Sequence, residues 1–301
     1  MAAADPRPAR LPLDGGVEGA AVVVHPMRTA EMLAMPRFLQ RPRGPLAELR
    51  GLGLLTPRSR WTRVPIPCFL VEHPGAGPIL VDTGLHASVA ENPAATLGRR
   101  AKAAYTIHME PGWSAAEQLR DDHGLEPGDV RLVIMTHLHY DHAGAIADFP
   151  RATFVVDAVE WRAATHGGFL QGYRRALFDH PFEWRTVRFD APEVESFASF
   201  GRTLDLLGDG SVRLLSTPGH TKGHVSVLLR LSGGRELLLT ADAAYARRTI
   251  DETLVPVFVD DTHVYRRSLG EIARYVELTP SASVVCGHDA EGWAAVQDVY
   301  R

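Results

Sequence analysis

The stretch THLHYDHAGA, Thr136–Ala145, sets three histidines and an aspartate close together. Imidazole and carboxylate groups cost free energy to bury unless a partner compensates them. The preceding run, VRLVIM, predicts a buried strand, and AGAIADF after it predicts the start of a helix. The polar side chains therefore fan out from one strand-to-helix turn, and their types are those that zinc binds.

Four ligands from one turn are too crowded for a single tetrahedral ion. We therefore expect two neighbouring ions, with His137 and His139 on one, and Asp141 and His142 on the other. Each ion then needs ligands from elsewhere in the chain. Three candidates follow strand-like runs, as expected for a site on loops of a rigid scaffold: His220 after LLSTPG, Asp242 after LLLTA and His288 after SVVCG.

The chain has 301 residues, of which 45% are hydrophobic and 23% charged, as is usual for a globular protein. A net charge of -4 favours neither a nucleic-acid nor a membrane partner. Cys68 and Cys286 do not make a disulfide framework, and no run of about 20 apolar residues predicts a membrane helix. We expect a cytoplasmic protein with a flexible leader at 1–16 and a single domain at 17–301.

Short runs rich in Val, Leu and Ile, bounded by Gly, Pro or Asp, predict the strands. They occupy 20–27, 66–74, 77–84, 130–139, 152–160, 212–220, 225–233, 235–244 and 282–290. Helical periodicity covers 111–124, 157–168 and 262–280, and more weakly 291–301. Both halves of the chain mix strands and helices, which predicts an α/β fold of packed layers.

The segment 28–63 differs in composition, because it holds eight arginines and no lysine. We interpret it as a solvated insertion over one edge of the fold. Its apolar residues, among them Met35 and Phe38, are alternatively candidates for a substrate pocket.

Five motifs in this order, THLHYDHAGA, TPGHTKGH, LTADAAY, VDTG and CGHD, resemble the metallo-β-lactamase superfamily. The resemblance extends from about Ile66 to about Gly292. It implies an αββα sandwich, in which two mixed sheets are flanked by helices and a two-metal site lies along one edge. One departure is Ala145, where the family motif usually has a second glycine.

A narrower resemblance is to the N-acyl-homoserine lactonases, because Tyr245 follows Asp242 by three residues and an acidic stretch comes after it. In that group the tyrosine reaches the substrate carbonyl. The ligand sets that the resemblance implies are His137, His139 and His220 for one metal, Asp141, His142 and His288 for the other, and Asp242 bridging both.

The implied cofactors are two divalent metal ions, zinc first, with iron, cobalt or manganese as alternatives. A hydroxide bridging them would attack the lactone carbonyl while Tyr245 stabilises the oxyanion. Asp141 would carry the proton to the leaving alkoxide. The partner would be a small-molecule lactone, which makes the protein a quorum-quenching hydrolase, with a homodimer possible by analogy.

The acyl tail needs an apolar groove, for which core packing is the alternative at every position. The candidates are Met35, Phe38, Phe169, Tyr173 and Phe178. Asp82 and His224 are expected to support the ligands rather than bind metal, with Asp82 accepting a proton from a ligand imidazole.

Other activities on the same scaffold stay open, namely a thioesterase resembling glyoxalase II or a different lactonase. A β-lactamase or a nucleic-acid phosphodiesterase fits the motifs, but neither an export signal nor a basic surface supports them. His139 argues against diiron members, which usually carry glutamate there. A non-catalytic scaffold is disfavoured because every expected ligand is present.

Overall fold

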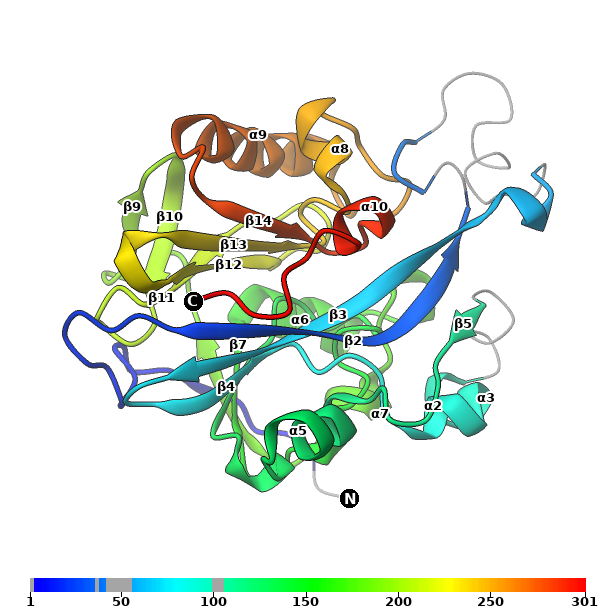
Figure 1. Cartoon of the computed structure of the whole chain (residues 1–301), viewed down its shortest axis with the longest axis horizontal. Coiled ribbons are helices and arrows are strands. Elements are labelled where there is room, and N and C mark those ends of the chain that lie inside the picture. The colour runs from blue at the N-terminus through cyan, green and yellow to red at the C-terminus, as the bar shows by residue number, and fades with distance from the viewer. Residues whose placement is uncertain (1–2, 36–37, 42–55, 99–105) are drawn as a thin grey trace.

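Two β-sheets face each other at the centre of the molecule, and helices cover their outer sides (Figure 1). The computed structural model describes residues 3–35, 38–41, 56–98 and 106–301. The larger sheet has the order β1-β8-β7-β6-β4-β3-β2-β5, and the smaller has the order β14-β13-β12-β11-β10-β9. Each sheet contains both parallel and antiparallel pairs. The predicted sandwich of two mixed sheets flanked by helices is therefore confirmed.

The strands of the larger sheet are β1 Arg7–Pro8, β2 Val23–Ala34, β3 Thr62–His73, β4 Gly77–Val81, β5 Ile107–His108, β6 Leu132–Ile134, β7 Thr153–Asp157 and β8 Glu183–Val187. Those of the smaller sheet are β9 Glu195–Phe197, β10 Phe200–Asp205, β11 Val212–Ser216, β12 Val225–Arg230, β13 Glu236–Ala241 and β14 Ser283–Cys286. The α-helices are α2 Ser88–Glu91, α3 Pro93–Leu97, α5 Ala115–His123, α6 Ala158–His166, α7 Arg175–Phe178, α8 Arg247–Asp251, α9 Thr262–Leu278 and α10 Ala290–Trp293.

The near-continuous apolar strands are explained by burial on both faces of each sheet. In β6, Ile134 packs between the sheets while Val133 packs under the outer helices. In β11, Leu214 faces the other sheet and Leu215 faces α9. Because side chains alternate along a strand, one run supplies two hydrophobic layers.

The strands that precede the candidate ligands end at one edge of the sandwich. Strand β4 is parallel to β6, and β13 is parallel to β14, so the carboxyl ends of each pair lie side by side. Strand β11 runs antiparallel to β12, which is antiparallel to β13, so β11 and β13 also point the same way. This topology gathers loops that are distant in sequence.

The amino-terminal segment differs from the flexible leader expected at 1–16. Among its described residues, Arg7–Pro8 forms β1, which pairs with β8, and Leu13 N donates to Leu206 O at 2.8 Å. Leu11 and Leu13 pack against the core between the sheets. The segment therefore lies against the domain, because its alternate leucines have apolar surface to bury.

The two ends of the arginine-rich segment 28–63 belong to strands of the larger sheet, so they are not part of an insertion. Arg28 lies in β2 and Arg63 in β3, and these two strands form a long antiparallel hairpin. Both arginines are within 3.3 Å of Glu31, so part of the positive charge is paired on the hairpin itself. The stretches 36–37 and 42–55 lie outside the described residues.

Two predicted helices are shorter than expected. The stretch after Asp141 makes turns and a single 3₁₀ turn at Ile146–Asp148, because its backbone turns back to bond residues near β4. The expected helix at 291–301 is reduced to α10, and Tyr300 instead bridges to Val24. No helix in the described part of the chain is both long and apolar enough to cross a membrane.

Phe178, expected in the acyl groove, belongs to the core at the end of α7. Its side chain is fully buried, and its ring lies 5.6 Å from that of Trp161, centroid to centroid. The aromatic cluster around Trp161 and Trp184 fills the space beneath α6. The groove prediction is wrong here because periodicity alone cannot tell a pocket wall from a core layer.

We predict that Phe178→Ala lowers the free energy of unfolding by about 3–5 kcal/mol, because it leaves a cavity in a closed core. Urea unfolding followed by fluorescence measures this change. Leu170→Ala is the matched control, because Leu170 is 90% exposed and its loss should scarcely change stability. Equal effects of the two substitutions would contradict the core assignment.

Candidate metal centre

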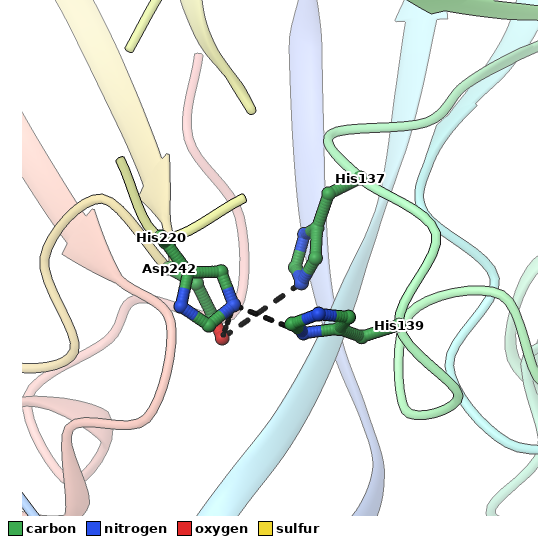
Figure 2. A group of neighbouring side chains, drawn as sticks. All are labelled: His137, His139, His220 and Asp242. Carbon is green, nitrogen blue, oxygen red and sulfur yellow. Dashed lines mark hydrogen bonds and ion pairs between the residues drawn. The ribbon is translucent and has the colours of Figure 1, made fainter. Parts of the chain in front are cut away.

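The structure brings all seven predicted ligand residues together at the edge where the strands end. One group consists of His137, His139, His220 and Asp242, and the other of Asp141, His142 and His288. Within each group the potential ligand atoms lie within 4.8 Å of one another. Figure 2 shows the first group converging from two sides, with His137 and His139 on the loop after β6 and Asp242 after β13.

Asp242 lies between the two groups and offers one oxygen to each. Its Oδ2 is 3.2 Å from His220 Nε2 and 3.9 Å from His137 Nε2. Its Oδ1 is 3.4 Å from His142 Nε2 and 3.3 Å from His288 Nε2. A carboxylate in this position could bind a cation held by either group.

Glycines allow the ligand loops to approach this closely. A Cβ on Gly287 would lie 2.6 Å from Asp242 Oδ1, so a larger residue before His288 would displace the carboxylate. Gly219, before His220, has a φ of +129°, and a Cβ there would lie 2.3 Å from the backbone of Tyr265. The glycines of the TPGH and CGHD motifs are therefore needed for the geometry.

Hydrogen bonds from Nδ1 orient three of the rings with Nε2 toward the centre of the site. The acceptors are Asp82 Oδ2 for His142 at 2.7 Å, Phe258 O for His220 at 3.1 Å and Pro65 O for His288 at 2.8 Å. A ring that donates from Nδ1 keeps a lone pair on Nε2, which is what a metal ion needs.

Three buried polar atoms in this site have no hydrogen-bond partner among the described residues: His137 Nε2, His142 Nε2 and Asp242 Oδ1. Leaving such atoms unpaired costs free energy. Divalent cations would give all three a partner, and neutral imidazole with carboxylate is a donor set that zinc accepts. The residues therefore fit a metal centre.

The electrostatics agree with this fit. Burial lowers the pKa of His137 and His220 well below the usual range and that of His139 to about 4, which keeps these rings neutral. Burial also opposes protonation of His142 and His288, but nearby carboxylates outweigh it and raise the pKa of both. The negative field that favours protons there also favours a divalent cation.

Asp82 supports His142, as predicted from the VDTG motif. It stands at a φ of +60° just after β4 and also accepts from the Thr136 amide and hydroxyl, both at 2.8 Å. His224 also supports the site, because its Nε2 accepts from the Asp242 amide at 3.1 Å. Burial lowers the pKa of His224 to about 3, which keeps that acceptor available.

Glu160 is a supporting residue that the sequence did not reveal. This fully buried carboxylate, in the first turn of α6, accepts from Leu138 N at 3.0 Å, Tyr173 Oη at 3.1 Å and Gly223 N at 3.2 Å. Burial raises its pKa despite these bonds. It joins the loop of His137 and His139 to the loop of His220. These segments are far apart in the sequence, so no local motif indicates the contact.

A cavity of about 790 Å³ opens over the site. Its wall includes ligand residues of both groups, with His139 and Asp141 among them, and Tyr245 beside them. Apolar side chains form much of the remaining wall: Met32, Phe38, Val159, Leu170, Val257, Phe258 and Val259. Pockets of this size and composition bind small organic molecules.

The structure divides the predicted groove residues. Phe38 lines the cavity and stacks on Tyr245 with ring centroids 4.5 Å apart, and Tyr173 lines it while its hydroxyl bonds Glu160. Met35 and Phe169 pack against the apolar cluster beside the cavity and do not line it. Those two predictions are corrected, because both side chains turn toward neighbouring apolar residues instead.

The sequence model of the metallo-beta-lactamase superfamily matches residues 61–288. The chain belongs to this superfamily. It is 34% identical over 234 residues to the N-acyl homoserine lactonase AttM of Rhizobium radiobacter, an alignment covering 77% of this chain and 84% of that protein. It is also 34% identical to the probable metallo-hydrolase Rv2300c of Mycobacterium tuberculosis, over 74% of each chain.

A solved structure with the same fold is an N-acyl homoserine lactone hydrolase with the product N-hexanoyl-L-homoserine bound at its catalytic metal center. It is 23% identical, covers 94% of this chain and 97% of its own, and aligns with a TM-score of 0.73. This likeness shows that the fold is shared.

We predict that Asp82→Asn weakens metal binding by about 10–100-fold, because His142 loses the charged acceptor that orients its ring. Competition with a chromogenic chelator measures the affinity. Asp148→Asn is the matched control, since Asp148 pairs with a surface histidine, His86, at 3.2 Å. Unchanged affinity in the Asp82 variant would contradict the supporting role.

We also predict that metal binding to chelator-treated protein releases protons at pH 7. The pKa of His142 is raised well above its usual range by nearby carboxylates and that of His288 is raised by Asp242, so both rings bind protons more readily in metal-free protein, and these protons compete with a cation for Nε2. Affinity should therefore rise with pH and fall on acidification. Zinc titration in a weakly buffered solution with a pH electrode measures the release, and a pH-independent affinity would contradict it.

Proposed function

We propose that this protein hydrolyses the lactone ring of N-acyl homoserine lactones at a centre of two divalent metal ions, for which zinc is the first candidate. The relatives at 34% identity named N-acyl homoserine lactonase support the substrate class. The donor set supports the cofactor, because Asp242 offers one oxygen to each ligand group. Quorum quenching is the biological role that this reaction implies.

The observation that carries the substrate assignment is the position of Tyr245. Its hydroxyl lies 3.2 Å from His220 Nδ1, and the residue lines the cavity beside the metal-binding side chains. The hydroxyl also donates to Phe258 O across a long 3.4 Å. Exchanging that weak bond for a substrate carbonyl would cost little.

Bound divalent cations would lower the pKa of water to about 7 and so supply a nucleophile at neutral pH. Tyr245 donates a hydrogen bond to the lactone carbonyl, and this bond strengthens as negative charge develops on the oxygen. His224 and Glu160 keep Asp242 and the ligand loops in place, so this geometry needs no rearrangement during the reaction.

Asp141 moves the proton. Its Oδ2 lies 3.5 Å from His288 Nε2, and the residue lines the cavity. A carboxylate there can take the proton released on attack and pass it to the alkoxide that leaves when the ring opens. The product is an acyl homoserine with a free carboxylate and a hydroxyl.

The acyl chain occupies the apolar wall. Phe38 covers one face of Tyr245, and Val159 and Leu170 expose 40% and 90% of their area, an unusual amount for apolar side chains beside a cavity. Burial of each methylene against such a wall contributes about 0.8 kcal/mol. We therefore expect KM to fall as the acyl chain lengthens from butanoyl to decanoyl.

Zinc-loaded protein should release acid from N-acyl homoserine lactones in a pH-stat assay, and chelated protein should not. Tyr245→Phe should lower kcat by about 100-fold or more, because it removes one donor to the oxyanion. Metal content measured on the same sample separates this effect from a loss of zinc, since the hydroxyl also contacts His220.

Tyr275→Phe is the matched control. Its hydroxyl bonds Glu236 at 2.7 Å, away from the cavity, so removing it should leave kcat unchanged. Rapid thioester hydrolysis with no ring opening by metal-loaded protein would contradict the lactone assignment while leaving the metal centre intact. An unchanged kcat in Tyr245→Phe would contradict the role of the tyrosine.

A further inference from the structure

A second set of metal-binding side chains lies far from the cavity. It consists of His25 on β2, Glu72 on β3 and His123 at the end of α5. The potential ligand atoms of the three residues lie within 4.8 Å of one another. His25 Nε2 is 3.2 Å from Glu72 Oε1, and the rings of His25 and His123 lie 4.6 Å apart, centroid to centroid.

Local structure places the three residues on one face. In the antiparallel pair of β2 and β3, His25 lies opposite Leu70 and Val23 lies opposite Glu72, so the His25 and Glu72 side chains are diagonal neighbours. Leu70 on the same face packs in one apolar cluster with Leu119 of α5. The helix ends at His123, where Gly124 adopts the left-handed conformation.

The geometry suits two ligands of one ion. His25 Nε2 is buried and makes no hydrogen bond within the described part of the chain, although Glu72 is only 3.2 Å away. A tetrahedral ion with bonds of about 2.0–2.1 Å separates its ligand atoms by about 3.3–3.4 Å. The spacing between His25 and Glu72 is close to that value.

The third ligand has suitable electrostatics. His123 is the last residue of α5, and its ring lies beside that of His25, so its imidazole can complete the set. The carboxyl end of α5 adds the negative end of a helix dipole, which favours a cation.

We propose that His25, Glu72 and His123 bind one divalent transition-metal ion, for which zinc is the first candidate. Water completes the coordination. Pro65 O accepts from His288 in the catalytic centre, and Glu72 lies seven residues further along β3. A strand rises about 3.3 Å per residue, so the two sites are roughly 23 Å apart. The ion ties α5 to the β2–β3 hairpin, and its role is structural and independent of the lactone reaction.

Zinc counting on the full chain tests this proposal. Protein loaded with zinc and freed of excess by gel filtration is analysed by inductively coupled plasma mass spectrometry. His123→Ala should hold one equivalent less than the wild type, and so should Glu72→Gln. Glu72 is exposed and His123 is partly exposed, so either variant can carry the test if the other does not fold.

His108→Ala is the matched control. His108 lies 3.3 Å from Glu110 in a comparable pair that has no third candidate ligand among the described residues, so its loss should not change the zinc count. Added zinc should also raise the Tm of the wild type more than that of His123→Ala, since an ion that binds only the folded state stabilises it. Equal zinc counts and equal Tm responses would overturn the proposal and leave His25 and Glu72 as an ordinary ion pair.

Discussion

The structure of the site depends on the burial of one carboxylate, Asp242, among imidazole rings. A charge in that position, 3% exposed, is stable only if its surroundings replace the water it has lost. Four ring nitrogens approach its two oxygens within 3.9 Å, yet Oδ1 makes no hydrogen bond with any described residue. Divalent cations would resolve this conflict, and the loops that follow strands of both sheets bring the candidate ligands around Asp242.

A surrounding layer of hydrogen bonds makes the arrangement rigid. Asp82 ties the loop after β4 to Thr136 and His142, and Glu160 ties α6 to the loops of His137 and His220. His224 accepts from the amide of Asp242 and so fixes the bridging residue from behind. The ligands are therefore preorganised by groups that never contact substrate, which is typical of metal centres.

Features that depend on short stretches of sequence are predicted well. The candidate ligands lie directly after apolar strands, and side chains of these types are costly to bury without a partner, so the strand ends and the metal-binding chemistry could be predicted together. The role of Asp82 followed from the same logic. The sequence predicts a helix after Asp141, but the structure has short turns there, because the backbone bonds distant residues, as in the hydrogen bond from Thr83 N to His142 O.

Features that depend on tertiary packing could not be predicted from sequence. Glu160 resembles an ordinary residue of a first helical turn, and its partners Leu138 and Gly223 lie far away in the sequence. Phe178 and Phe38 belong to the same residue type, yet one fills the core and the other lines the cavity. The tertiary structure determines whether an apolar side chain lines the cavity or packs in the core.

Anomalous diffraction at the zinc edge, from crystals of the zinc-loaded protein, tests the central claim most directly. We expect two peaks about 3.5–4 Å apart, each about 2.0–2.2 Å from a different oxygen of Asp242. One peak should be bound by His137, His139 and His220, and the other by Asp141, His142 and His288. A single peak, or two peaks with Asp242 bound to neither, would contradict it.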